Sequence, residues 1–487
     1  MRITAGLFLI AVLLLAGCPH GNGETTTPPE VTPPAQTPVL LGATLVLPGG
    51  DLMEFQLTLQ PKDGGGWDGS MFYLLKQDLV IPLDDLAYAA AAIRFTAIAP
   101  GQPEEARATF EAPLQGDPPW VGTLTQAGHS AEFSLVPMPD RPQTPQPPFP
   151  YSTRELDFDN PDGTHLAGTL TVPEGAGPHP AVILLTGSGL QNRDYALFWH
   201  KPWVVIADAF ARRGIATLRF DDRAVGGSTG NPSDTTMNDM AADAVAGVEA
   251  LALQPDIDPE RIGVLGHSQG ATVAALASNL SERVKFVVHL AGMALPGGEI
   301  LVIQEGLIMA AAGVPPEPIA ELQEVHRRLH TLLLDPAADE AAVREAARDV
   351  MVRQYGIGTT YLGAPEHTLT EAEIDHAMAV WRAPATMDLV GFDPVPVLSK
   401  VKVPFLALNG TLDLQVPCQP DLEAAERLVG ESGNTDVTVR ALDGLNHAFQ
   451  PAVTGNIDEY EQIATTIDPA ALDIIIDWIR AHTGLGD

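Results

Sequence analysis

The chain has few cysteines and few basic residues, and each scarcity excludes a class of protein. Its 487 residues include 2 Cys, 27 Lys and Arg, and 62 Asp and Glu, which gives a formal charge of −35. This excess of negative charge repels phosphate backbones, so we expect no nucleic-acid partner. The cysteines are too few for a disulfide framework, and stability must come from a hydrophobic core. The hydrophobic fraction of 45% argues against wholesale disorder, and a length of 487 residues predicts roughly two to three domains.

The first 17 residues have the pattern of an export signal. Arg2 precedes an apolar run over residues 7–15, and small residues follow before Cys18. The run is shorter than the roughly 20 residues that a membrane-spanning helix needs. Residues 1–17 are therefore predicted to be a cleaved signal peptide.

The end of this signal resembles the lipobox of bacterial lipoproteins. Leu15-Ala16-Gly17-Cys18 carries the resemblance, which implies cleavage before Cys18 and acyl chains attached to Cys18. Two or three acyl chains suffice for stable anchoring. We expect an exported protein held to the cell envelope through Cys18. The outer membrane is favoured in a Gram-negative cell, because Pro19 stands where an inner-membrane retention signal has Asp.

Residues 18–38, rich in Pro and Thr, are predicted to form an extended tether.

Residues 39–137 alternate apolar and polar side chains in short segments separated by Gly and Pro, as in residues 43–47 and 54–59. Such alternation predicts antiparallel strands. We expect a small all-β domain, a barrel or curled sheet of roughly eight strands, which serves as a spacer or as a binding module. The Pro-rich residues 138–151 are predicted to form an extended linker at a domain boundary, since proline cannot join a sheet ladder.

From residue 152 the pattern changes to nearly continuous apolar strands that alternate with helices. It predicts a doubly wound, mostly parallel α/β sheet with helices on both faces. Residues 297–398 have helical periodicity without strand patterns, so they are expected to form a helical cap insertion within the domain 152–487. The expected strands are residues 181–185, 216–220, 262–265, 286–290, 405–408 and 437–440.

A G-x-S-x-G motif lies at Gly266-His267-Ser268-Gln269-Gly270, after one predicted strand and before an apolar helix. In such a strand-turn-helix the glycines permit a sharp turn, and the serine hydroxyl is exposed at the carboxyl edge of the sheet. Ser268 is therefore the candidate nucleophile.

A serine hydroxyl needs a general base, and the base needs a group that orients it. Asp413 follows the predicted strand 405–408, and His447 follows the strand near residue 440. The order Ser268, Asp413, His447 is that of an α/β-hydrolase triad. Asp443 is a rival acid, but it lies in the same loop as His447, so Asp413 is preferred.

Acyl transfer also needs donors for the developing oxyanion. One is expected to be the backbone N–H of Gln269, directly after the nucleophile. The other is expected from the loop after strand 181–185, where Ser188 is the first choice and Gly189 the second.

Residues 152–485 resemble the bacterial exported serine esterases of the α/β-hydrolase family, and the β domain with its linker resembles the N-terminal part of some members. The resemblance implies a Ser-His-Asp hydrolase that forms an acyl-enzyme on short-chain carboxylic esters, without a cofactor. Where such relatives often have Gly after Asp-Asp-Arg, this chain has Ala224. The motifs that carry the resemblance are Gly187-Ser188-Gly189, Phe220-Asp221-Asp222-Arg223, Gly266–Gly270, Leu408–Asp413 and Leu445-Asn446-His447.

Three other functions remain open. An exported peptidase and an acyltransferase with a non-water acceptor share the triad. A surface binding lipoprotein would use the β domain and leave the hydrolase fold idle, but such a protein has no need for three residue types in triad order.

The remaining candidates are assigned as follows. Gln304, Trp381 and Met387 of the expected cap are candidates for the substrate pocket. His326 and His330 have a spacing that can bind metal, but Arg327 and Arg328 lie between them, and a solvated helix is expected instead. No metal site is predicted.

Two further groups have structural interpretations. Asp221-Asp222-Arg223 is interpreted as a loop-fixing ion pair rather than a catalytic carboxylate pair. Cys418 is expected to be a half-buried structural thiol.

Overall fold

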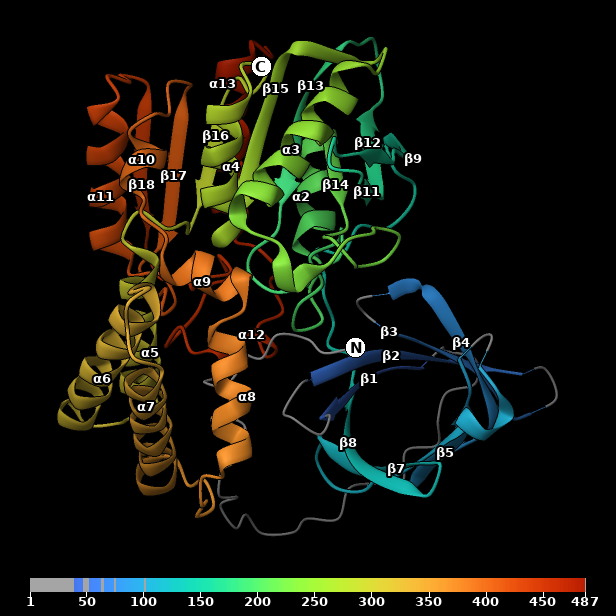
Figure 1. Cartoon of the computed structure of the whole chain (residues 1–487). Coiled ribbons are helices and arrows are strands. Elements are labelled where there is room, and N and C mark those ends of the chain that lie inside the picture. The colour runs from blue at the N-terminus through green and yellow to red at the C-terminus, as the bar shows by residue number, and fades with distance from the viewer. Residues whose placement is uncertain (1–38, 47–51, 63–64, 74–75, 100–101, 487) are drawn as a thin grey trace. The chain divides into compact units, whose positions relative to one another are not determined.

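The computed structural model describes residues 39–46, 52–62, 65–73, 76–99 and 102–486 (Figure 1). These residues form two compact units, divided after Asp140. The predicted signal peptide 1–17, the tether 18–38 and Cys18 lie outside the described residues.

In the described part of the first unit, eight antiparallel strands close into a barrel. Alternate residues point inward, so Leu57, Leu59, Ile93 and Leu135 are buried, and Phe95 stacks on a neighbouring ring. The prediction of a small all-β domain is confirmed, and apolar side chains fill its interior. The strands are β1 (Val39–Val46), β2 (Leu52–Pro61), β3 (Trp67–Tyr73), β4 (Lys76–Ala89), β5 (Ala92–Ala97), β6 (Ala108–Pro113), β7 (Trp120–Gln126) and β8 (His129–Pro137).

The second unit is built on an eight-stranded sheet with the order β18-β17-β16-β15-β13-β14-β12-β9. The strands from β14 to β18 run parallel, and β12 is antiparallel to both of its neighbours. The predicted mostly parallel sheet is therefore confirmed. Its strands are β9 (Tyr151–Glu155), β12 (Gly168–Pro173), β13 (His179–Leu185), β14 (Ala216–Phe220), β15 (Ile257–His267), β16 (Val287–Leu290), β17 (Phe405–Gly410) and β18 (Val437–Leu442).

Helices cover both faces of this sheet (Figure 1), which explains why its central strands are apolar throughout. Within β13, Ile183 packs on one face, and Val182 and Leu184 pack on the other. One face carries α3 (Met237–Ala252), α4 (Gln269–Leu280) and α11 (Cys418–Glu431), and the other carries α2 (Pro202–Ala211) and α13 (Pro469–Thr483). A short hairpin, β10 (Phe158–Asp159) and β11 (His165–Leu166), pairs outside the sheet.

The predicted helical insertion lies between β16 and β17, as expected. Its helices pack on one another around a separate apolar cluster that includes Leu322, Leu329, Val343 and Val350. Its members are α5 (Gly297–Ala311), α6 (Pro316–Leu334), α7 (Glu340–Tyr361), α8 (Glu371–Trp381), α9 (Pro384–Val390) and α10 (Val395–Leu398).

The segment expected to be a linker is largely part of the second unit. That unit begins at Arg141, earlier than the expected start at residue 152, and Arg141 is only 8% exposed. The Pro-rich composition of residues 138–151 predicts an extended chain, but composition does not show whether other segments bury that chain. Among the described helices, none has the length and apolar character needed to span a membrane.

Candidate active site

Ser268 occupies a strained turn between β15 and α4. Its φ is 56°, a left-handed conformation that a non-glycine residue adopts only when the surroundings hold it there. A Cβ on Gly266 would lie 2.0 Å from the carbonyl oxygen of Gly270, and a Cβ on Gly270 would lie 2.2 Å from that of Thr186. Both glycines of the motif are therefore required by close backbone approach, as its spacing predicted.

Asp413 and His447 form a buried pair in the loops that follow β17 and β18. His447 Nδ1 lies 2.8 Å from Asp413 Oδ2, and the side chains are 6% and 0% exposed. The other carboxylate oxygen, Oδ1, accepts hydrogen bonds from the backbone N–H groups of Gln415 and Val416 at 2.7 and 2.9 Å. The carboxylate is thus held from both sides. The rival Asp443 instead accepts a hydrogen bond from Thr411 Oγ1 at 3.2 Å.

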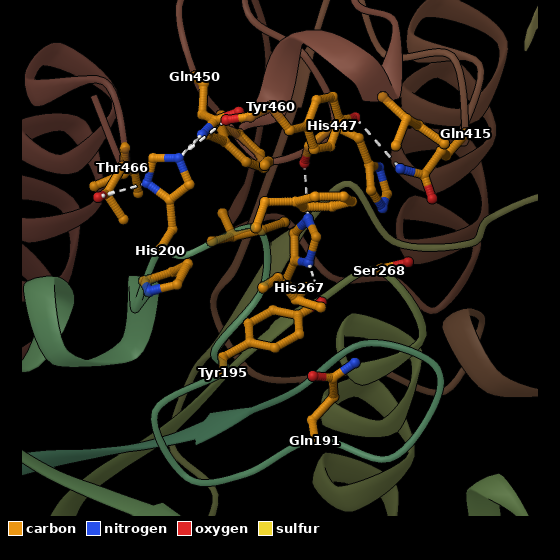
Figure 2. Close-up of a pocket in the computed structure, with 18 of the residues that line it drawn as sticks. Gln191, Tyr195, His200, His267, Ser268, Gln415, His447, Gln450, Tyr460 and Thr466 are labelled. Atoms are coloured by element: carbon orange, nitrogen blue, oxygen red, sulfur yellow. Dashed lines mark hydrogen bonds between the residues drawn. The ribbon is translucent and has the colours of Figure 1, made fainter. Parts of the chain in front are cut away.

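Ser268 and His447 line one cavity of about 190 Å³ (Figure 2). Ser188 lines the same cavity. Asp413 lies behind His447. The structure therefore brings the three predicted triad residues to one place at the carboxyl edge of the sheet. Most of the other lining side chains are apolar: Leu197, Phe198, Pro202, Trp203, Ile206, Leu290, Ile308, Ala448, Phe449, Ile457 and Ile467.

The two expected oxyanion donors lie in the two segments next to Ser268. Ser188 follows β13 and lines the cavity, whereas Gln269 is the first residue of α4. A Cβ on Gly187 would lie 3.2 Å from Ser268 Cβ, so this loop passes directly against the nucleophile. Gly189, the second choice, lines a neighbouring cavity together with Gln269.

Asp222 holds the loop that carries Ser188. It accepts hydrogen bonds from Thr186 Oγ1 at 2.8 Å and from the backbone N–H of Gln191 at 2.9 Å, so its carboxyl group brackets residues 187–190. Burial raises the pKa of Asp222 to about 7. The position of the loop that carries Ser188 therefore depends on a side chain from the loop after β14.

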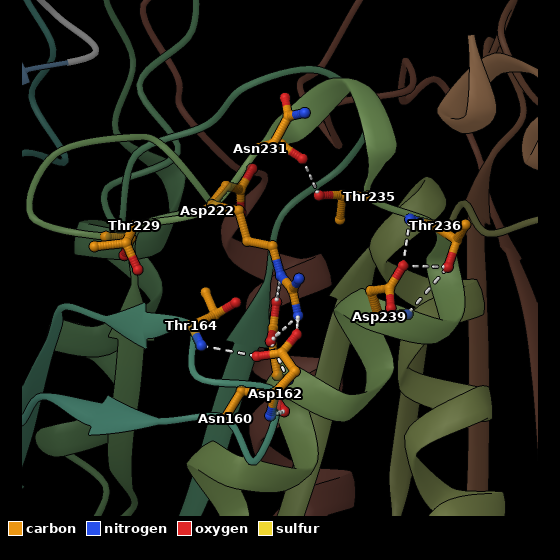
Figure 3. Close-up of polar contacts among 12 residues, drawn as sticks. Asn160, Asp162, Thr164, Asp222, Thr229, Asn231, Thr235, Thr236 and Asp239 are labelled. Atoms are coloured by element: carbon orange, nitrogen blue, oxygen red, sulfur yellow. Dashed lines mark hydrogen bonds and ion pairs between the residues drawn. The ribbon is translucent and has the colours of Figure 1, made fainter.

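The neighbouring Asp221 and Arg223 fix the loop as expected, but each forms ion pairs with residues outside the Asp221-Asp222-Arg223 motif rather than within it. Asp221 Oδ2 lies 2.8 Å from Arg193 Nη2. Arg223 donates to Asp243 at 2.6 Å and to Asp162 at 2.9 Å (Figure 3). These pairs connect the loop after β14 to α3 and to the β10–β11 hairpin.

Ala224, which stands where relatives often have Gly, adopts φ 66°. A side chain in this conformation is strained by about 1–2 kcal/mol. Ala224→Gly removes that strain but makes the unfolded chain more flexible, which opposes the gain by about 0.4–1 kcal/mol. We expect a net stabilisation of about 0.5–1 kcal/mol, measured as a higher urea midpoint. The matched control is Ala320→Gly, at an exposed position inside α6, which should destabilise by about 1 kcal/mol. A lower midpoint for Ala224→Gly would contradict the assigned backbone conformation.

Tyr195 and His267 form a buried bridge that the sequence analysis missed. His267 Nε2 lies 2.8 Å from the carbonyl oxygen of His447, which can only accept, so Nε2 carries the proton. Nδ1 therefore accepts a hydrogen bond from the Tyr195 hydroxyl at 2.9 Å (Figure 2). Burial and the neighbouring His447 lower the pKa of His267 to about 3, so it is neutral. The bridge links the loop after β13 to the triad histidine. In the sequence, this bridge was indicated only by the position of His267 within the G-x-S-x-G motif.

The three pocket candidates from the cap have different positions. Gln304 lines the cavity. Trp381 and Met387 do not line it; they pack against the apolar cluster of the cap. Helical periodicity identifies an apolar face but does not show whether that face meets a substrate or another helix, and here it meets another helix.

The expectation of a solvated helix at His326 and His330 was wrong, since both side chains are buried. His326 Nδ1 lies 2.5 Å from Glu305 Oε2, and Gln354 donates to the other oxygen of Glu305 at 2.7 Å. Among the described residues, no group of three His, Cys, Asp or Glu side chains is arranged to hold a metal ion.

Cys418 is half-buried as expected, and burial raises the pKa of its thiol to about 11. A thiol with so high a pKa is a poor nucleophile near neutral pH. The cysteine therefore does not compete with Ser268 as the reactive group of this unit.

Comparison with known proteins agrees with this geometry. Residues 145–295, which include Ser268, match the family model described as "Esterase FrsA-like". The second unit is an α/β unit whose mostly parallel, eight-stranded sheet is covered by helices on both faces. The chain is similar to Esterase EstD of Thermotoga maritima, with 27% identity over 285 residues that cover 58% of this chain and 57% of the relative. It is also similar to Thiohydrolase apmlB of Arthrinium phaeospermum, with 32% identity over 145 residues, or 30% of this chain and 44% of the relative. The chain thus spans about half the length of the curated relatives it matches.

Among solved structures, the α/β hydrolase GrgF from Penicillium sp. sh18 matches with a TM-score of 0.42 and 18% identity, and the match covers 69% of this chain and all of that one. A Pyrococcus furiosus esterase matches with a TM-score of 0.40 and 16% identity over 71% of this chain and 98% of that one.

Proposed function

We propose that the protein is a serine carboxylic ester hydrolase that acts on short-chain acyl esters through Ser268, His447 and Asp413. One observation carries the proposal: a buried Asp413–His447 pair and a strained Ser268 reach the same apolar cavity. The match of residues 145–295, which include Ser268, to an esterase family model supports it, as does the similarity to Esterase EstD.

In this mechanism His447 Nε2 takes the proton of the Ser268 hydroxyl while Oγ attacks the ester carbonyl carbon. Asp413 accepts from His447 Nδ1–H, which keeps Nε2 free as the base and stabilises the imidazolium that forms. The backbone N–H groups of Ser188 and Gln269 donate to the oxyanion of the tetrahedral intermediate.

The intermediate collapses when the C–O bond to the alcohol breaks and His447 returns the proton to that oxygen. A water then repeats the cycle on the acyl-enzyme, releases the carboxylic acid and restores Ser268. Each step uses the same histidine, so one buried pair serves both halves of the reaction.

The test is a set of initial rates on p-nitrophenyl esters from acetate to laurate, with Ser268→Ala as the control. We expect hydrolysis by the wild-type chain that is fastest on short acyl groups, and none above background by the variant. Aminoacyl p-nitroanilides are measured in parallel. Turnover of the anilides but not of the esters would favour the peptidase function over the esterase function. Equal rates for the wild-type chain and Ser268→Ala on every substrate would contradict the proposal.

A further inference from the structure

We propose that Arg141, at the beginning of the second unit, is a positioning residue that holds one wall of the catalytic cavity against the loop of His447. This inference rests on the proposed esterase function, because it assigns Arg141 an effect on the same cavity.

The Arg141 guanidinium joins two loops that are far apart in the sequence. Nη1 donates to the carbonyl oxygen of Ile463 at 2.9 Å, and Nη2 donates to those of Glu461 at 2.8 Å and Phe198 at 3.0 Å. The residue is 8% exposed. A planar guanidinium can serve several carbonyls at fixed angles, which a lysine ammonium on its flexible stem cannot reproduce.

Gln143 extends the same contact. Its Nε2 donates to the carbonyl oxygen of Ile467 at 2.8 Å, and its Oε1 accepts from the backbone N–H groups of Thr466 and Ile467 at 2.7 and 3.1 Å. The side chain thus satisfies backbone groups that have no strand partner. Thr466 and Ile467 both line the catalytic cavity, as does Phe198 on the other loop.

The loop of residues 461–467, which Arg141 and Gln143 hold, contacts His200, and His200 also lines the cavity. His200 Nδ1 lies 2.9 Å from Thr466 Oγ1, and His200 Nε2 lies 3.0 Å from the carbonyl oxygen of Tyr460 (Figure 2). Burial, and then the positive charge of Arg141, lower the pKa of His200 to about 4. A neutral imidazole therefore faces the cavity at neutral pH, and the buried cation behind it helps to keep it neutral.

From His200 the contacts continue to the triad. Gln450 lies beside the His200 ring, and its Oε1 accepts from Asn446 Nδ2 at 2.9 Å. The backbone N–H of Asn446 donates to the carbonyl oxygen of Gln450 at 3.0 Å. Asn446 directly precedes His447. The loops that Arg141 holds therefore pack, through His200 and Gln450, against the residue that precedes the catalytic histidine.

Loss of the Arg141 side chain is expected to affect catalysis in a specific way. Loss of Arg141 leaves the carbonyls of residues 198, 461 and 463 without this donor, so the loops must shift to find water. Because those loops form one side of the cavity, the shift changes which acyl groups fit. A general loss of folded protein, by contrast, reduces the rate on every ester by the same factor.

The experiment compares Arg141→Ala, Arg141→Lys and Gln143→Ala in the full chain. The matched control is Gln146→Ala, at an exposed position of the same segment whose amide contacts only the carbonyl of Thr144. For each chain, kcat and KM are measured on p-nitrophenyl acetate and octanoate, and a fluorophosphonate titration gives the fraction of active sites.

Per active site, we expect both Arg141 variants to lower kcat/KM by about tenfold or more and to change the acetate-to-octanoate ratio at least fivefold. Gln143→Ala should change that ratio in the same direction, and Gln146→Ala should match the wild type. If the Arg141 variants do not fold, Gln143→Ala alone decides. An unchanged ratio per active site in the folded variants overturns the proposal. Absence of wild-type turnover on both esters would instead contradict the esterase function.

Discussion

Asp413→Asn is expected to lower kcat/KM on the best ester by about 10⁴-fold while the chain stays folded. Two backbone N–H groups, of Gln415 and Val416, donate to Oδ1, so the amide oxygen of asparagine must occupy that position. The amide NH₂ then faces His447 Nδ1 in place of a carboxylate oxygen. Since two donors cannot face each other, His447 is driven to the tautomer with the proton on Nε2, which cannot accept from Ser268.

The matched control for this variant is Asp443→Asn. Asp443 lies near His447 in the sequence but contacts Thr411, so its replacement should change kcat/KM by less than about threefold. A large loss for Asp443→Asn with little loss for Asp413→Asn would reverse the assignment of the triad acid. Steady-state kinetics on one p-nitrophenyl ester, with circular dichroism of each variant, measure both effects.

Ser268→Ala is expected to lower kcat by about 10⁶-fold, to near the background rate. The variant removes the hydroxyl while the close contacts of Gly266 and Gly270 still impose the turn. The catalytic base and the oxyanion donors remain but have no nucleophile to activate.

Ser188→Ala is the matched control for the serine variant. The proposed oxyanion donor at this position is a backbone N–H, which alanine retains, so we expect a change in kcat of less than about threefold. A loss comparable to that of Ser268→Ala would show that the Ser188 hydroxyl takes part in catalysis. Pre-steady-state and steady-state rates on p-nitrophenyl acetate distinguish these results.

Much of the fold was predictable because its signals are local. Parallel strands covered on both faces, such as β13 and β17, are apolar over their whole length, and such runs stand out between helices. The barrel domain was predictable from alternation and turn residues. The strands β9 and β12 were missed, since each is short and follows a Pro- or Gly-containing segment that resembles a loop.

The placement of the proposed triad residues was predictable for a similar reason. Each member follows a strand that could be recognised, and parallel strands bring their carboxyl ends to one edge of the sheet. Ser268 also lies within a motif whose glycines are required by contacts as close as 2.0 Å. Fold and site were therefore predicted from the same pattern of strands.

The supporting contacts were not predictable, because they join residues that are distant in the sequence. Arg141 meets Glu461 and Ile463, and Tyr195 meets His267, through single side chains with no periodic signal. The pocket assignments of Trp381 and Met387 were wrong because the partner of an apolar helix face is a tertiary property. The beginning of the second unit at Arg141 was missed because a Pro-rich composition predicts an extended chain, which can lie in solvent or along a protein surface.

The most direct test of the account is mass spectrometry of the intact chain and its peptides after incubation with an alkyl fluorophosphonate. A serine that is activated by His447 displaces fluoride and forms one phosphonyl ester. We predict a single adduct on the peptide that contains Ser268, no adduct on Ser268→Ala, and strongly slowed labelling of Asp413→Asn. An unmodified wild-type chain, or an adduct at another serine that persists in Ser268→Ala, would contradict the assignment of Ser268 as the nucleophile.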